Sequence, residues 1–136
     1  MRQVTAAVII ENGRMLLTRR PPGDPLAGMW ELPGGKIEPG ETPQECVERE
    51  LLEELEMTCR AGHIIAQTTY DYEHGSFEIL ALEVQRLSNF VLKNHDATVW
   101  AKLERLADYV LAPADITLIS QIVPGASPHR DRPGAH

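Results

Sequence analysis

Residues 32–57 read LPGGKIEPGETPQECVERELLEELEM, a loop rich in glycine and proline followed by an amphipathic segment. Thr42 can cap a helix, Pro43 can take its first position, and Glu45, three residues after Thr42, completes a capping box. The helical spacing of apolar residues continues to Leu55. This stretch therefore predicts a helix from Pro43 to Leu55 that begins directly after the loop.

Acidic residues gather on one side of the predicted helix. Glu50, Glu53 and Glu54 stand at positions i, i+3 and i+4, so they fall within an arc of roughly 100°. Like charges at this spacing repel one another, whereas a hard divalent cation such as Mg²⁺ prefers carboxylate oxygens. The residues alone leave two interpretations open, a solvated acidic helix face and a metal site.

The residues around the acidic face favour the metal site. Gly34 and Gly35 allow the backbone to approach a ligand closely, and a backbone carbonyl there could complete the coordination of a cation. Arg49 could orient a neighbouring carboxylate through a two-pronged hydrogen bond. Without this context, Arg49 is equally compatible with an ordinary surface arginine.

From Gly35 to Met57 the residues follow the pattern G-x5-E-x7-R-E-U-x-E-E-x-G-U, in which U is aliphatic. This pattern is the signature of the Nudix hydrolases, and the chain resembles that family at every fixed position except Glu56, where the family has glycine. A glycine at this point ends the helix in a left-handed conformation. Because a glutamate in that conformation is strained by roughly 1 kcal/mol, we expect a different helix exit in this chain.

The resemblance implies a set of ligands for Mg²⁺ or Mn²⁺, namely the side chains of Glu50, Glu53 and Glu54 and the carbonyl of Gly34. It also implies that Arg49 holds Glu50, which would serve as the base for an attacking water. The expected catalytic residues are therefore Glu50, Glu53 and Arg49. Glu41 would stabilise the loop or contact a further cation through water. Such cations neutralise a diphosphate and lower the pKa of a bound water.

The likeness continues outside this stretch, in residues 16–20, 30–38 and 111–116. These segments resemble the MutT-type nucleoside triphosphate pyrophosphohydrolases, and the last resembles the branch known for CTP, the CTP pyrophosphohydrolase-like branch. The resemblance implies three substrate-binding residues: Arg20 for the phosphates or sugar, Leu32 for the base pocket, and Asp115 for the edge of the base.

The hydrogen-bonding chemistry of Asp115 limits the choice of nucleobase but does not identify it. A carboxylate at Asp115 accepts hydrogen bonds, which suits the amino group of cytosine and equally the N1 and N2 donors of guanine or 8-oxoguanine. It could instead stabilise the start of a helix near Pro113. MutT-type enzymes often carry a glutamate in the loop before the last strand, where Asn94 stands here. Asn94 can ligate a cation but cannot accept a proton, so Asp96 or His95 would have to substitute, unless both are simply solvated.

Hydrophobic patterns predict the remaining elements. These are a hairpin from residues 4–10 and 15–18 around Asn12-Gly13, a second hairpin from 64–72 and 76–84, a strand at 98–101, and a helix at 114–123 after Pro113. The first strand is expected to be buried on both faces. This irregular mixture predicts an α+β fold, which the resemblance specifies as a Nudix-type α/β/α sandwich with a mixed β-sheet. The domain is expected to cover residues 1–123, followed by a disordered tail at 124–136.

Composition sets the broad class of the protein. A length of 136 residues suits one domain. The net charge of −7 argues against binding to polymeric nucleic acid, but not against a small phosphate ligand beside a cation. Cys46 and Cys59 are too few for a disulfide scaffold. With neither a signal peptide nor a membrane span in the sequence, we expect a cytoplasmic monomer or homodimer.

Taken together, the residues and the resemblance predict Mg²⁺-dependent hydrolysis of a nucleoside triphosphate to the monophosphate and pyrophosphate. CTP, 5-methyl-dCTP and 8-oxo-dGTP are the expected candidates. Two alternatives stay open: a hydrolase of another nucleoside diphosphate-linked substrate, and a non-catalytic nucleotide-binding protein. The short chain disfavours the first alternative, and the complete set of carboxylates disfavours the second.

Overall fold

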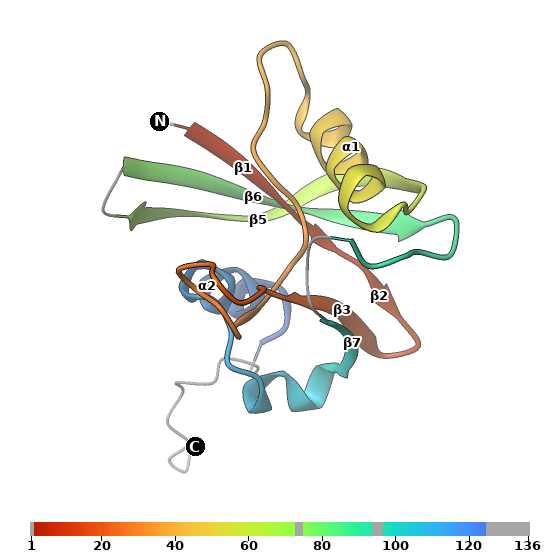
Figure 1. Cartoon of the computed structure of the whole chain (residues 1–136), viewed down its shortest axis with the longest axis vertical. Coiled ribbons are helices and arrows are strands. Elements are labelled where there is room, and N and C mark those ends of the chain that lie inside the picture. The colour runs from red at the N-terminus through yellow and green to blue at the C-terminus, as the bar shows by residue number, and fades with distance from the viewer. Residues whose placement is uncertain (1, 73–74, 94–96, 125–136) are drawn as a thin grey trace.

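Two β-sheets pack with two α-helices in the computed structural model, which describes residues 2–72, 75–93 and 97–124 (Figure 1). The strands are β1 (Arg2–Val8), β2 (Ile10–Glu11), β3 (Arg14–Arg19), β4 (Trp30–Glu31), β5 (Cys59–Tyr72), β6 (Gly75–Arg86) and β7 (Ala97–Lys102). The helices are α1 (Pro43–Leu55), α2 (Pro113–Ile122) and a 3₁₀ helix, η1 (Leu103–Asp108). Within these described ranges, no helix is long and apolar enough to cross a membrane.

The first sheet is mixed, as predicted. β1 runs parallel to β6, and β6 runs antiparallel to β5. Along the other side of β1 lies the segment 33–37. The N–H of Ala7 donates to the carbonyl of Pro33 and the N–H of Thr5 donates to that of Gly35, each at 2.7 Å. This pairing extends the sheet up to the loop that precedes α1.

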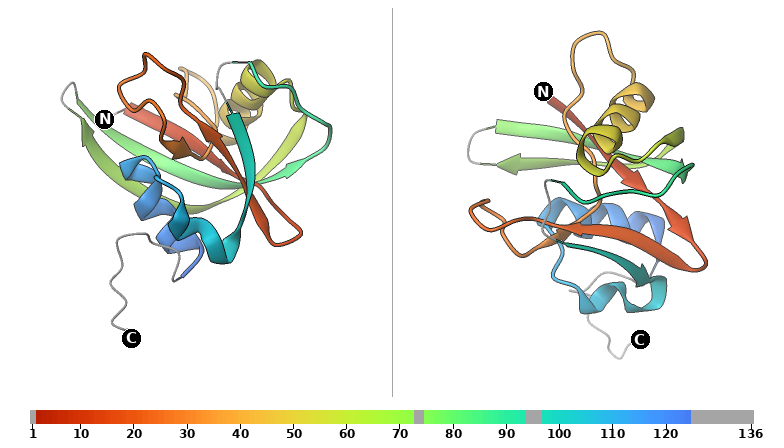
Figure 2. Two further views of the ribbon diagram at one scale, coloured as in Figure 1. Left: turned by 60° about the horizontal axis from the view of Figure 1, so that its bottom comes forward. Right: turned by 45° about the vertical axis from the view of Figure 1, so that its right-hand side comes forward.

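Both faces of β1 are buried, which confirms the prediction from its continuous apolar run. Ala6 and Val8 belong to a core that includes Leu118 of α2, whereas Ala7 belongs to a core that includes Leu51 of α1. Because successive side chains of a strand point to opposite faces, the two helices cover opposite faces of the sheet (Figure 2). The α/β/α sandwich is therefore confirmed.

The predicted first hairpin is correct only at its tip. Asn12 and Gly13 form the turn with φ values of 52° and 74°, and these positive values suit the tight turns of hairpins. Only β2 pairs with β3, however, because the preceding residues of β1 pair in parallel with β6. A partner about 75 residues away leaves no trace in a local hydrophobic pattern.

The other predicted elements are confirmed. Helix α1 has the predicted bounds, and its capping box is formed in both directions: the Glu45 N–H donates to the Thr42 hydroxyl at 3.0 Å, and the Thr42 N–H donates to the Glu45 carboxylate at 2.9 Å. The second hairpin, β7 and α2 are present. The short strand β4 and the 3₁₀ helix η1 were not predicted. Of the tail expected to be disordered, residues 125–136 lie outside the described residues.

Helix α1 ends at Glu56, and here the expectation of a different helix exit is wrong. Glu56 itself takes the left-handed conformation, with φ 52° and ψ 34°. The Met57 N–H donates back to the carbonyl of Leu51 at 3.2 Å, and the Glu56 N–H donates to that of Leu52 at 3.0 Å, so carbonyls of the last turns of the helix are satisfied after its end. Met57 is fully buried, and Lys93 forms an ion pair with the Glu56 carboxylate at 3.0 Å. Burial of Met57 and this ion pair offset the strain that favours glycine.

The strain at Glu56 predicts that glycine is more stable than alanine at this position, the reverse of their order in a helix interior. We expect Glu56→Gly to be more stable than Glu56→Ala by about 1 kcal/mol, since both variants lose the ion pair and only alanine retains the strained conformation. Urea denaturation of the two variants measures this difference. Greater stability of the alanine variant, as in a helix interior, would contradict the left-handed cap.

Candidate active site

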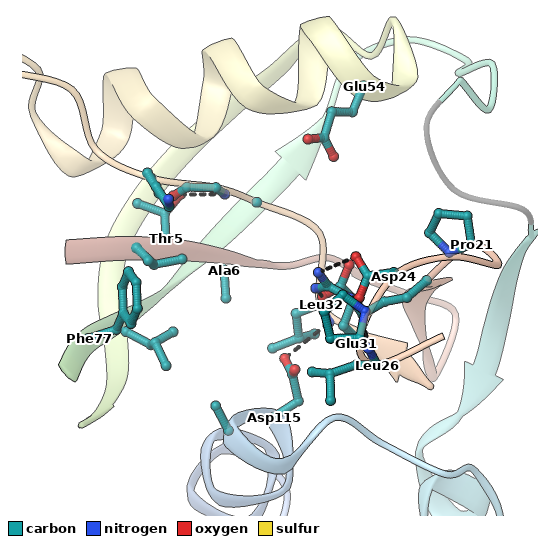
Figure 3. Close-up of a pocket in the computed structure, with 18 residues that line it drawn as sticks. Thr5, Ala6, Pro21, Asp24, Leu26, Glu31, Leu32, Glu54, Phe77 and Asp115 are labelled. Atoms are coloured by element: carbon teal, nitrogen blue, oxygen red, sulfur yellow. Dashed lines mark hydrogen bonds and ion pairs between the residues drawn. The ribbon is translucent and has the colours of Figure 1, made fainter. Parts of the chain in front are cut away.

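A cavity of about 520 Å³ opens between α1 and the start of α2 (Figure 3). Its wall includes five residues singled out from the sequence: Arg20, Leu32, Gly34, Glu54 and Asp115. Glu54 reaches toward it from α1, and Asp115 rises into it from α2. The glycine- and proline-rich loop supplies much of the wall between these two side chains. Residues from distant parts of the chain thus face one space.

The paired glycines have separate structural reasons. A Cβ atom on Gly34 would collide with the backbone carbonyl of Thr5 in β1. A Cβ atom on Gly35 would collide with the carboxylate of Glu50 in α1. Both missing side chains would meet the protein itself, and the close approach to a ligand expected from the sequence stays a prediction. The glycines let the loop lie tightly between the sheet and the acidic helix.

Arg49 links the loop to the acidic helix. Its guanidinium donates two hydrogen bonds to the Glu41 carboxylate, one of them from Nη2 at 3.0 Å. Nη2 also donates to the carbonyl of Lys36 at 3.1 Å, and Nη1 donates to Glu50 at 3.1 Å and to Glu53 at 3.2 Å. The hydrogen bonds from Arg49 and from the Glu38 N–H hold the pKa of Glu41 at about 2. Glu41 is therefore ionised at any physiological pH.

The three helix carboxylates lie in different surroundings. Glu50 lies against Gly35 with 14% of its side chain exposed, Glu53 is 58% exposed beside Arg49, and Glu54 faces the cavity. In the part of the chain that the structure describes, no three acidic, histidine or cysteine side chains converge on one metal position. Glu50 and Glu53 are held at Nη1 of Arg49, whereas Glu54 lines the cavity.

The donor set nevertheless fits a hard divalent cation. Gly34 lines the same cavity as Glu54. The carbonyls of Pro33 and Gly35 face β1, and carbonyls of an extended segment alternate in direction, so that of Gly34 points away from the strand. Carboxylate and carbonyl oxygens are the ligands that Mg²⁺ and Mn²⁺ prefer.

Comparison with known proteins shows the family. The model of the NUDIX domain matches residues 1–121. The chain belongs to the Nudix family. Members of this family generally use a divalent cation, which agrees with the oxygen donors around the cavity.

Three relatives show how this Nudix chain compares with known members. CTP pyrophosphohydrolase of Escherichia coli K12 is 37% identical over 123 residues, which cover 88% of this chain and 89% of the relative. The 8-oxo-dGTP diphosphatase of the same strain is 40% identical over 62 residues, 46% of this chain and 48% of that protein. The solution structure of the E. coli ORF135 protein superposes with a TM-score of 0.83 at 34% identity, covering 96% of this chain and 95% of that one.

Arg20 of this Nudix domain is held by two carboxylates. Its Nε and Nη2 donate to the two oxygens of Asp24, each at 2.8 Å, and its Nη1 donates to Glu31 at 2.6 Å. Sequence reasoning singled out Arg20 but missed both partners, although all three line the cavity. The turn-forming Pro-Pro-Gly before Asp24 was the only available signal, because it folds the loop back onto Arg20.

Asp115 is buried at the start of α2, where it accepts a hydrogen bond from the N–H of Leu32 at 3.1 Å. Burial and the nearby charge of Glu31 raise its pKa to about 8. The side chain therefore keeps its proton at neutral pH, whereas the sequence interpretation assumed an ionised carboxylate. Asn94, His95 and Asp96, named as candidates for the base or a further ligand, lie outside the described residues.

The different surroundings of the two glycines predict different costs for alanine. We expect Gly34→Ala to lower the free energy of unfolding by about 2 to 3 kcal/mol, because the carbonyl of Thr5 lies in a paired strand and cannot move. Gly35→Ala should cost less, since the Glu50 carboxylate ends a flexible side chain. Urea denaturation measures both. An equal or larger loss for Gly35→Ala would contradict the contacts described.

Asp115 predicts a pH-dependent stability. Its pKa rises from an ordinary value near 3.8 to about 8 on folding, so between these values the folded state keeps a proton that the unfolded state has lost. This contribution to stability is complete below pH 4 and declines as the pH rises to about 8. We expect Asp115→Asn to remove the decline, so that its stability relative to wild type increases by about 1 kcal/mol or more between pH 5 and 8. If the free energies of unfolding of the variant and the wild type, measured by urea denaturation, differ by the same amount at every pH in this range, the raised pKa is contradicted.

Proposed function

We propose that this chain hydrolyses a nucleoside triphosphate to the nucleoside monophosphate and pyrophosphate with Mg²⁺ as its cation. One observation carries the proposal: Glu54 of the acidic helix and Asp115 of α2 face one cavity from opposite sides, and Gly34 and Leu32 line the same cavity. The two ends of a nucleotide match these two sides of the cavity: its polyphosphate requires a cation, and its base requires a pocket of complementary shape. The names of the relatives support the same reaction class.

The metal-binding end would use the oxygen donors of Glu50, Glu53, Glu54 and Gly34. When bound, Mg²⁺ or the alternative Mn²⁺ would neutralise the polyphosphate and make a bound water more acidic. Arg49 orients Glu50 through the hydrogen bond at 3.1 Å, and Glu50 would accept the proton of the attacking water. Glu41 fixes the position of Arg49 relative to the loop, because its ionised carboxylate accepts two hydrogen bonds from the guanidinium.

The protonated state of Asp115 favours cytosine over guanine. A neutral carboxylic acid has one donor and one acceptor, which match the N3 acceptor and the N4 amino donor of cytosine. Guanine and 8-oxoguanine present two donors, N1–H and N2–H, and match an ionised carboxylate better. We therefore propose CTP and related cytosine nucleotides as the preferred substrates. 8-oxo-dGTP is a second candidate, because one relative is an 8-oxo-dGTP diphosphatase.

Two further properties belong to this proposal. Cys46 and Cys59 are free thiols, which supports a reducing compartment such as the cytoplasm. The nucleotide would bind to a monomer or to each subunit of a homodimer.

Substitution of the proposed metal ligands tests the function. With Mg²⁺ and a panel of CTP, dCTP, 5-methyl-dCTP, dGTP and 8-oxo-dGTP, we expect pyrophosphate release by the wild type and a loss of about 100-fold or more in kcat for Glu53→Gln and Glu54→Gln. Glu104→Gln, an exposed carboxylate on η1, is the matched control and should keep wild-type activity. No pyrophosphate release from any nucleotide would refute the proposal, and nucleotide binding by calorimetry without turnover would favour the non-catalytic alternative.

A further inference from the structure

The cavity wall contains an ion triad formed by Arg20, Asp24 and Glu31. Arg20 uses three of its five N–H groups on the two carboxylates, at 2.6 to 2.8 Å. All three side chains are partly accessible, with exposed fractions of 31%, 21% and 15% for Arg20, Asp24 and Glu31. One positive and two negative charges leave the triad with a net charge of −1, although it contains the arginine expected to bind the phosphates or the sugar.

This net charge makes the triad a poor partner for phosphate. A phosphate that approached Arg20 would also approach two carboxylates within hydrogen-bond distance of that guanidinium, and like charges repel most strongly where water is partly excluded. A hydroxyl group meets no such penalty. It can donate to a carboxylate oxygen, and hydrogen bonds to ionised acceptors are among the stronger ones in proteins.

The triad also lies in the part of the cavity where the sugar of a bound nucleotide would be expected. In Figure 3, Asp24 and Glu31 lie between Glu54, at the proposed polyphosphate end, and Asp115, at the proposed base end. Glu31 immediately precedes Leu32, whose N–H binds Asp115. In a nucleotide, the sugar occupies this same place between its phosphates and its base.

The loop around the triad holds its carboxylates in place before any ligand binds. The Asp24 carboxylate accepts a further hydrogen bond from the Leu26 N–H at 2.9 Å. The Arg20 N–H donates to the carbonyl of Met29, and the Gly28 N–H donates to the carbonyl of Arg20, each at 3.0 Å. Because these contacts fix the loop, little conformational freedom would be lost on binding.

We propose that Asp24 and Glu31, oriented by Arg20, accept hydrogen bonds from the sugar hydroxyls of the nucleotide and so determine selectivity for the sugar. This inference rests on the proposed function, because it takes the cavity to hold a nucleotide. Of the two roles expected for Arg20, at the phosphates or at the sugar, it selects the sugar, and it makes Arg20 a positioning residue there. Asp24 and Glu31 are the residues that contact the substrate.

Binding of product nucleotides tests the sugar site without requiring turnover. Isothermal titration calorimetry would compare CMP with 2′-deoxy-CMP and 3′-deoxy-CMP, for the wild type and for Asp24→Asn and Glu31→Gln. We expect loss of at least one hydroxyl to weaken binding to the wild type about tenfold or more, and one of the two variants to reduce this difference to about threefold or less. Asp108→Asn, which removes an exposed ion pair with Arg105, is the matched control and should preserve the wild-type difference.

A phosphate-binding role for Arg20 predicts that the Asp24→Asn substitution strengthens nucleotide binding. If Arg20 binds phosphate, Asp24→Asn removes a competing anion, so CMP, both deoxy analogues and free pyrophosphate should all bind more tightly. That result would overturn the inference, as would equal binding of the three nucleotides to the wild type. Sugar selectivity without pyrophosphate release from any nucleotide would refute the proposed function and leave the sugar site standing. Urea denaturation of each variant confirms that the compared proteins are folded.

Discussion

Backbone pairing between β1 and the segment 33–37 determines where the parts of the site lie. The two hydrogen bonds at 2.7 Å, from Ala7 to Pro33 and from Thr5 to Gly35, bring the loop against the sheet. This approach leaves no room for a side chain at Gly34, and Gly35 lies against the Glu50 carboxylate of α1. Helix α1 begins a few residues later, so the same pairing sets the distance between its carboxylates and the cavity. A side chain at Gly34 would push the loop away from β1, and one at Gly35 would displace the Glu50 carboxylate.

Charge is distributed over the site in two arginine-centred groups. Arg49 joins the loop to Glu41, Glu50 and Glu53 on the side of the acidic helix. Arg20 joins two carboxylates on the opposite wall. Each arginine has more acidic partners than its single positive charge can neutralise. Both groups are therefore net negative, as is the chain with its net charge of −7. A bound cation would then supply the positive charge that a polyphosphate requires.

Local sequence signals predicted the elements that local forces determine. The capping box placed the start of α1 correctly and the apolar spacing placed its end, and the apolar run of β1 correctly indicated burial on both faces. Long-range pairing was not predictable, so the parallel partner of β1 was missed. The left-handed Glu56 was also missed, because burial of Met57 and the contact with Lys93 appear only in three dimensions. The proton on Asp115 and the partners of Arg20 likewise depend on neighbours that only the folded chain brings together.

Phosphorus-31 NMR of the products tests the central claim most directly. Purified protein would be incubated with Mg²⁺ and with CTP or 8-oxo-dGTP, and the spectrum would identify which phosphorus bond is cleaved. The proposed function predicts a nucleoside monophosphate and pyrophosphate in equal amounts. Formation of a nucleoside diphosphate and orthophosphate, or persistence of both triphosphates unchanged, would contradict it.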